Sequence, residues 1–298
     1  MKRESFGSRL GFILVSAGCA IGIGNVWKFP YICGAYGGAA FILIYLCFLV
    51  ILGIPVLVAE FAVGRGSHTS VAKCFDKLAP AGSGWKPLKF IGIIGCYMLM
   101  MFYTTVGGWM IYYCVKSLRG DFVGATPEAV TQSFSDMLGN APTMMLWMVI
   151  ICLIGFAVCF MGLQNGIEKI SKVMMSALLI IMVILAVHSV MMEGAGEGIR
   201  FYLVPDFQKI KEAGVGNVVF AALSQSFFTL SIGIGAMLIF GSYLDKSRSL
   251  TGEAVSITVL DTFVALTAGF IIIPACFAYG VQPVSYTHLR AHETELHL

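Results

Sequence analysis

Long apolar runs separated by short polar stretches are the feature that most limits what this chain can fold into. A helix needs about 20 apolar residues to cross a bilayer, and several runs exceed that length. Composition agrees, since 58% of the 298 residues are hydrophobic and only 12% are charged. The sequence therefore predicts an all-α polytopic membrane protein with about seven spanning segments: residues 10–32, 39–62, 88–116, 143–161, 167–192, 215–241 and 252–279.

The charged connections between these runs predict how the segments are oriented. The stretch of residues 65–89 is basic, whereas residues 121–136 are acidic. Because Lys and Arg favour the cytoplasmic side, we expect a multi-pass protein of the cell (inner) membrane with a cytoplasmic N-terminus. The net charge of +3 then reflects this topology and contact with the lipid bilayer, and it gives no reason to expect nucleic-acid binding.

The motif Ile-Gly-Ile-Gly occurs twice, at residues 21–24 and 232–235, each time inside an apolar run. Glycine in a helix interior costs about 1 kcal/mol relative to alanine, and a backbone group freed from its helix in hydrocarbon needs another partner. One explanation is close helix packing through small residues. The other is a pair of helices broken at membrane depth, which is typical of the binding sites of secondary transporters.

Further motifs follow in order along the chain. They comprise the run from Ser16 to Pro30, Gly37-Gly38-Ala39-Ala40-Phe41, Gly53-Ile54-Pro55, Gly64-Arg65, Tyr103, Gly107-Gly108-Trp109, Gly166-Ile167-Glu168-Lys169, Pro205-Asp206-Phe207 and Ser224–Ser231. Over roughly residues 3–283 this set resembles the neurotransmitter:sodium symporter family, whose bacterial members carry amino acids. The resemblance implies a five-plus-five inverted-repeat fold with discontinuous helices 1 and 6, and sodium-coupled symport by alternating access.

By this resemblance, two sodium ions (Na+) would bind at the breaks. Sodium is a hard cation that needs several oxygen ligands, and an unwound helix supplies its own carbonyls. The first site would combine the substrate carboxylate with oxygens of Ala20, Asn25, Thr229 and Asp261. The second site would use the carbonyls of Gly18 and Ile21 with ligands on an eighth helix, which we expect to lie outside this chain.

The resemblance also implies a site for a small-molecule amino acid. Helix N-terminal amides of Ile23 and Gly24 would bind the substrate carboxylate. The other implied contacts are Ala20, Leu99, Tyr103, Phe228, Thr229, Ser231 and Ile234. Family members that carry monoamines have an aspartate where Gly22 stands here, so we expect a substrate that brings its own carboxylate and has a hydrophobic or aromatic side chain.

An ionisable residue inside a span is expensive and by default functional. Asp261 stands in such an apolar stretch, residues 254–270. Chloride-dependent relatives need an anion near the first sodium, and others carry a protein carboxylate there. We therefore expect no chloride requirement, with Asp261, Tyr45 and Gln225 at the anion position.

Gate residues follow from the same resemblance. Lys28 stands where many relatives carry the arginine of the external gate, and Arg3 and Phe6 match the cytoplasmic gate. We expect Glu60 of the second span to support the first break through a hydrogen bond.

The domain prediction places the first five-helix repeat at residues 1–192 and an external loop at 193–214. Residues 215–283 would form the first two helices of the second repeat, and residues 284–298 read as a tail foreign to the fold. The chain would then be an incomplete copy of a transporter.

Other functional classes stay open to different degrees. The main alternative is a non-transporting membrane fragment, or a protein that only associates with other helices. A channel would need pore-lining rings or a filter repeat, and neither is found in the sequence. The chain is not expected to be an enzyme, because no span carries a catalytic set at the required spacing.

Overall fold

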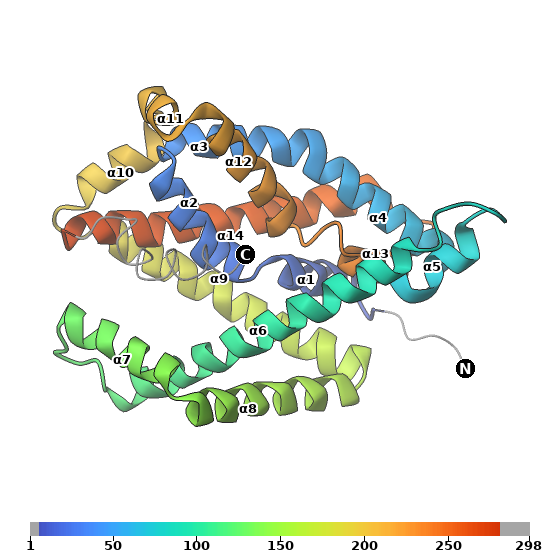
Figure 1. The fold of residues 1–298 in the computed structure, drawn as a ribbon, viewed down its shortest axis with the longest axis horizontal. Helices are drawn as coiled ribbons and strands as arrows, with labels where there is room; N and C mark the ends of the chain where they lie inside the picture. Colours follow the sequence, from blue (N-terminus) through green and yellow to red (C-terminus); the bar gives the residue numbers. More distant parts are fainter. Residues whose placement is uncertain (1–5, 281–298) are drawn as a thin grey trace.

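The computed structural model describes residues 6–280, and all regular elements within this range are helices (Figure 1). Three of them, labelled η, are π-helical turns that continue into α-helices. The elements are α1 (Arg9–Ala20), η1 (Gly24–Lys28), α2 (Phe29–Ala35), α3 (Ala39–Phe48), η2 (Leu49–Gly53), α4 (Ile54–Ser67), α5 (Val71–Leu78), α6 (Leu88–Arg119), α7 (Pro127–Gly139), α8 (Ala141–Phe160), η3 (Leu163–Glu168), α9 (Lys169–Val190), α10 (Ala195–Leu203), α11 (Phe207–Ala213), α12 (Val215–Thr229), α13 (Ala236–Gly241) and α14 (Leu250–Ala278).

Helices long and apolar enough to cross a membrane confirm most of the predicted spans. Five continuous helical stretches qualify by length and composition: Ala39–Ser67, Leu88–Arg119, Ala141–Phe160, Leu163–Val190 and Leu250–Ala278. A sixth span is the bent pair of α1 and η1–α2, whose axes differ by 57°. The seventh predicted span, residues 215–241, consists of α12 and the short α13 with a non-helical segment between them.

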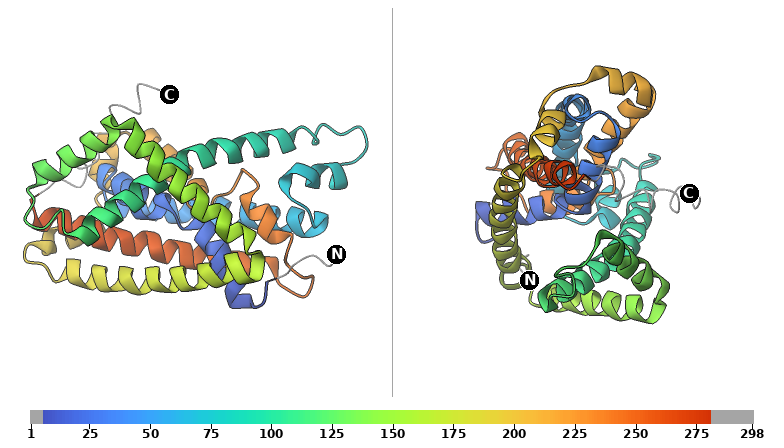
Figure 2. Two further views of the ribbon diagram at one scale, coloured as in Figure 1. Left: turned by 90° about the horizontal axis from the view of Figure 1, so that it is seen from below. Right: turned by 90° about the vertical axis from the view of Figure 1, so that its left-hand side faces the viewer.

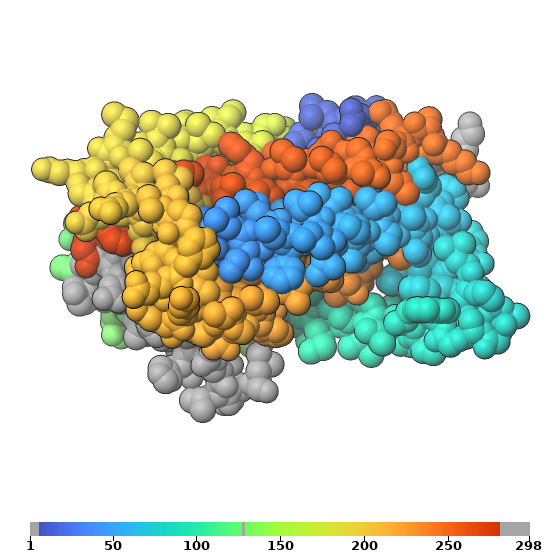
Figure 3. Space-filling view, turned by 90° about the horizontal axis from the view of Figure 1, so that it is seen from above, coloured from blue at the N-terminus to red at the C-terminus, as the bar shows by residue number. Residues whose placement is uncertain are grey.

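Helix α14 lies at the centre of the main helical body. It packs against α1, α2, α4, α9 and α10, and Ile257, Val264 and Ile273 on it are fully buried. Small residues allow the close approach of α10, because a Cβ atom on Gly198 would lie 2.7 Å from the Cα atom of Pro274. Figure 3 shows α3 and α4 in blue across one face of this body, beside the start of α14 in orange.

Helices α6, α7 and α8 form a second group, which meets the main body along α6. Figure 2 shows them to one side of α14. Helices α6 and α8 touch at Gly108, where a Cβ atom would lie 2.8 Å from the backbone nitrogen of Met148. No residue of α8 is buried, so the described chain covers this helix on few sides.

The predicted external loop of residues 193–214 contains two short helices, α10 and α11. The Tyr202 hydroxyl of α10 donates a hydrogen bond to the carbonyl of Leu266 at 2.9 Å, and its side chain is buried. This contact fastens the connection between α9 and α12 to the central helix. The predicted tail, residues 284–298, lies outside the described residues.

Candidate functional site

The first break separates α1 from η1. Helix α1 ends at Ala20, and Ile21 has extended backbone angles, φ −69° and ψ 107°. Because the helix resumes only at the end of this break, the amides of Ile23 and Gly24 stand at a new helix start, where N–H groups have no partner within the helix. The first helix is therefore interrupted at the predicted motif.

The second break lies between α12 and α13. Helix α12 ends at Thr229, and the segment up to Gly235 is built of turns. Ser231, Gly233 and Gly235 have positive φ angles of 51°, 94° and 77°. Such angles suit glycine but are uncommon for serine. The glycines of the second motif thus serve the turn that interrupts the helix.

Three fully buried side chains bring the two breaks together on α14. The Asn25 amide nitrogen donates to Asp261 Oδ1 at 2.8 Å and to Thr229 Oγ1 at 3.0 Å. The Thr229 hydroxyl donates to Asp261 Oδ2 at 2.8 Å. All three residues are 0% exposed. We call Asn25, Thr229 and Asp261 the junction.

The junction has the chemistry of a cation site. Its side chains supply an amide oxygen, a hydroxyl and a carboxylate, which are the ligands that hard cations take in proteins. In this structure, N–H and O–H donors satisfy the carboxylate of Asp261. A cation would replace those donors, and Asn25 would rotate to present its Oδ1 atom, which now accepts from the Gly22 amide at 3.3 Å.

Two aromatic side chains lie against the first break. A Cβ atom on Gly22 would lie 3.4 Å from the Tyr103 hydroxyl oxygen, so this hydroxyl faces the break from α6. A Cβ atom on Gly24 would lie 2.7 Å from the Phe228 ring, which packs on the break from α12. The Lys28 ammonium lies 4.2 Å from the centre of that ring. The Phe228 ring therefore contacts both the first break and the ammonium group of Lys28.

The predicted anion position is polar and closed to solvent. Tyr45 and Gln225 are both 0% exposed. The Gln225 amide nitrogen donates to the carbonyl of Gly24 at 3.1 Å. Its Oε1 atom has no hydrogen-bond partner within the described part of the chain. Gln225 thus supports the first break while it keeps one polar atom unmatched near the junction.

The remaining predicted substrate contacts lie on the second break, on α6 and at the end of α1. The Ser231 hydroxyl donates to the carbonyl of Cys19 at 3.1 Å, which ties the second break to α1. Ile234 packs on Gly95 of α6, where a Cβ atom would lie 3.2 Å from its side chain. Leu99, one turn further along α6, is half-buried. Ala20 is buried at the end of α1.

The predicted second sodium position lies at the α1 end of the first break. Gly18 faces α9, since a Cβ atom there would lie 3.2 Å from the Met175 sulfur. Ile21 is buried and caps α1. Of the predicted gate residues, Phe6 makes edge-to-face contacts with Phe12 and Tyr243. Arg3 lies outside the described residues.

The expectation for Glu60 is wrong. Its Oε1 atom accepts from the amide of Gly233 at 2.6 Å, so it supports the second break and not the first. The sequence shows that a carboxylate in a span needs a partner, but it does not show which of two similar glycine motifs lies opposite.

Two buried carboxylates at the start of α1 have roles that the sequence did not reveal. Glu168 accepts from the Gly7 amide at 2.8 Å and pairs with Lys172. Glu253 pairs with Arg9 at 2.9 Å. Glu168 and Glu253 are 3% and 2% exposed. Glu168 belongs to one of the motifs that carry the family resemblance, whereas Glu253 was marked only as an acidic residue at the beginning of an apolar run.

The comparisons with known proteins agree with this geometry. A profile of the sodium:neurotransmitter symporter family matches residues 3–130 and 129–282. The chain belongs to the sodium:neurotransmitter symporter family. The uncharacterized sodium-dependent transporter YhdH of Bacillus subtilis is 36% identical over 282 residues, covering 95% of this chain and 61% of the relative. An uncharacterized sodium-dependent transporter of Haemophilus influenzae is 33% identical over 291 residues, covering 95% and 63%.

A solved structure gives the same family and fold. The crystal structure of MhsT in complex with L-phenylalanine superposes with a TM-score of 0.86 and 38% sequence identity, covering 95% of this chain and 63% of MhsT. The predicted all-α symporter fold is thus confirmed, and the relatives are transporters and not enzymes. The chain spans about three fifths of the length of these relatives.

Proposed function

We propose that this symporter-family protein couples the transport of an amino acid to sodium by alternating access. The observation that carries the proposal is the junction, where Asn25 of the first break and Thr229 of the second meet the buried carboxylate of Asp261. A cation held there would tie both broken helices to α14. Release of the cation would let the breaks separate, which couples ion binding to helix movement.

The substrate we propose is a hydrophobic or aromatic amino acid. Its carboxylate would lie at the amides of Ile23 and Gly24 and the hydroxyl of Tyr103. Gly22 supports this class, because it places no acidic side chain beside Tyr103. Phe228 would cover the side chain, and L-phenylalanine bound to the similar MhsT is in keeping with such a ligand.

We further propose two sodium ions and no chloride requirement. The carboxylate of Asp261 supplies a fixed negative charge in the place where chloride would otherwise be needed. The first ion would bind at the junction, and the second would bind at the carbonyls of Gly18 and Ile21.

Uptake into proteoliposomes tests the proposal. The expected result is accumulation of tritiated L-phenylalanine driven by an inward sodium gradient, and its loss when potassium replaces sodium. Asn25→Ala should abolish the sodium dependence, whereas Asn217→Ala, on the exposed start of α12, should not. Sodium-dependent binding without uptake would favour the alternative, a membrane protein that does not transport. Neither binding nor uptake of any hydrophobic amino acid would refute the proposal.

A further inference from the structure

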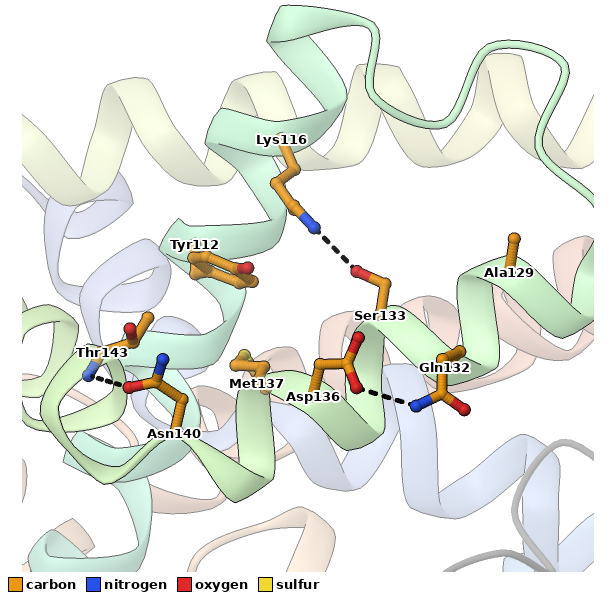
Figure 4. Close-up of a pocket in the computed structure, with 9 residues that line it drawn as sticks. All are labelled: Tyr112, Lys116, Ala129, Gln132, Ser133, Asp136, Met137, Asn140 and Thr143. Atoms are coloured by element: carbon orange, nitrogen blue, oxygen red, sulfur yellow. Dashed lines mark hydrogen bonds between the residues drawn. The ribbon is translucent and has the colours of Figure 1, made fainter.

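A cavity lies between the end of α6, helix α7 and the start of α8 (Figure 4). Its volume is about 460 Å³, within the range of about 300–1,000 Å³ typical of small-molecule sites. Figure 1 shows α7 at the opposite end of the molecule from α5. None of the residues that line this cavity belongs to the junction or to the substrate contacts proposed above.

The cavity contains one positive and one negative side chain that do not pair with each other. Lys116 and Asp136 both line it, and neither forms an ion pair with any side chain that the structure describes. The Lys116 ammonium donates to the Ser133 hydroxyl at 2.8 Å, and Asp136 accepts from the Gln132 amide at 2.8 Å. Both charges are thus positioned by neutral groups.

Aromatic rings fix the position of the ammonium group. Lys116 Nζ lies 5.3 Å from the centre of the Tyr112 ring and 5.7 Å from that of Phe122. Such cation–π contacts restrict a side chain that would otherwise be flexible. Helix α7 is in turn held on α6 by the edge-to-face contact of Phe134 with Trp109. The rings thus position the positive charge on helices that pack against each other, and Asp136 stands exposed at the rim of the cavity.

The pattern of charges selects the class of ligand. An inorganic anion would be attracted by Lys116 but repelled by Asp136. A simple amine, which is positively charged, would be attracted by Asp136 but repelled by Lys116. A molecule with both charges satisfies both side chains. Asn140 adds a donor, since its Oδ1 atom already accepts from the Thr143 amide and leaves the Nδ2 group available. Tyr112 and Met137 provide an apolar wall for a small side chain.

We propose that this cavity binds a zwitterionic amino acid, with its carboxylate on Lys116 and its ammonium group on Asp136. The site is separate from the junction and does not depend on sodium. It gives the protein a second place to bind an amino acid, at the end of the helices remote from α5.

Isothermal titration of the purified full chain tests this proposal, with L-serine as the probe in sodium-free potassium buffer. L-serine should bind saturably, and Asn25→Ala should bind it equally well because that variant alters only the junction. L-serine methyl ester lacks the carboxylate and N-acetyl-L-serine lacks the ammonium group. Each should bind at least tenfold more weakly than L-serine.

Two charge-removing variants identify the groups. Lys116→Met should lose at least tenfold in L-serine affinity and bind the ester as well as L-serine. Asp136→Asn should show the same loss and no longer discriminate against the N-acetyl compound. Arg119→Met and Asp121→Asn, whose side chains do not line the cavity, should behave like the wild type. Absence of saturable L-serine binding, or equal binding of either derivative by the wild type, would overturn the proposal.

Discussion

Asp261 brings a negative charge to the junction between two neutral partners. Both of its carboxylate oxygens accept hydrogen bonds, one from Asn25 and one from Thr229. A carboxylate that is 0% exposed is costly unless it is paired, so a cation bound there would stabilise it strongly.

We therefore predict that Asp261→Asn weakens sodium binding at least tenfold, or by about 1.4 kcal/mol. Sodium-dependent binding of tritiated L-phenylalanine measures this loss, with Asp245→Asn on an exposed turn as the control. In the wild type, the same binding should persist when gluconate replaces chloride. Loss of binding in gluconate would show that an anion, and not Asp261 alone, supplies the charge.

Gly24 permits the Phe228 ring to lie directly on the first break. A Cβ atom at Gly24 would lie 2.7 Å from this ring, a distance that forces the ring to move, whereas one at Gly22 would lie 3.4 Å from Tyr103, an ordinary contact. Gly24→Ala should therefore weaken L-phenylalanine binding about tenfold, and Gly22→Ala should weaken it less. Equilibrium binding compares them. If steric contact is the cause, Phe228→Leu should restore part of the affinity in the Gly24→Ala background, and two additive losses would contradict this.

At the scale of elements, the start of α1 is fastened by carboxylates from η3 and α14. Glu168 of η3 accepts from Gly7, and Glu253 of α14 pairs with Arg9. In the Arg9–Glu253 ion pair, the arginine side chain is 52% exposed, whereas the glutamate side chain is 3% exposed. The two partners of this ion pair are therefore not equivalent. Loss of Arg9 leaves a buried charge unpaired, but loss of the charge on Glu253 leaves an arginine that water can solvate.

We predict that Arg9→Gln destabilises the protein by about 2–3 kcal/mol, and Glu253→Gln by about 1 kcal/mol or less. Thermal unfolding in detergent, followed by tryptophan fluorescence, gives the order of the two effects. Lys211→Gln, on an exposed position of α11, is the matched control. A larger loss for Glu253→Gln would contradict the unequal burial of the pair.

Val71, the first residue of helix α5, lies against the second break and against α6. A Cβ atom on Gly92 of α6 would lie 2.8 Å from the Val71 side chain, and a Cβ atom on Gly235 of the second break would lie 2.7 Å from it. Gly92→Ala should therefore separate α5 from the break and lower thermal stability, although alanine favours the helix by about 1 kcal/mol. Val71→Ala in the same chain should recover the loss. Gly155→Ala in α8, where no atom lies within 4 Å, should not destabilise, and an equal loss there would rule out the steric explanation.

At the scale of the whole molecule, the sequence predicted the features that depend on the chemistry of a single segment, such as the apolar spans and the helix breaks. The two glycine motifs predicted both breaks because the cost of glycine in a helix is a property of the segment itself. The contacts that close the site depend on distant pairs. Glu168 and Gly7 are 161 residues apart, and Arg9 and Glu253 are 244 apart. No periodicity in the sequence reports such pairs, which is why Glu60 was assigned to the wrong break.

The charges at the two ends of α6 predict how the whole molecule is oriented in the membrane. The end near α5 carries Lys86 in an exposed turn, and the other end is followed by the exposed Asp121. Figure 1 shows α5 and α7 at opposite ends of this helix. Because basic connections favour the cytoplasm, we predict that the α5 end lies inside the cell together with the start of α1.

Labelling of intact cells with a membrane-impermeant maleimide tests this orientation. Asp121→Cys should be labelled from outside, whereas Lys86→Cys should react only after the membrane is permeabilised. The unsubstituted chain, which has nine cysteines, gives the background. Labelling of Lys86→Cys in intact cells would place the basic end outside, and the cavity lined by Lys116 and Asp136 would then face the cytoplasm.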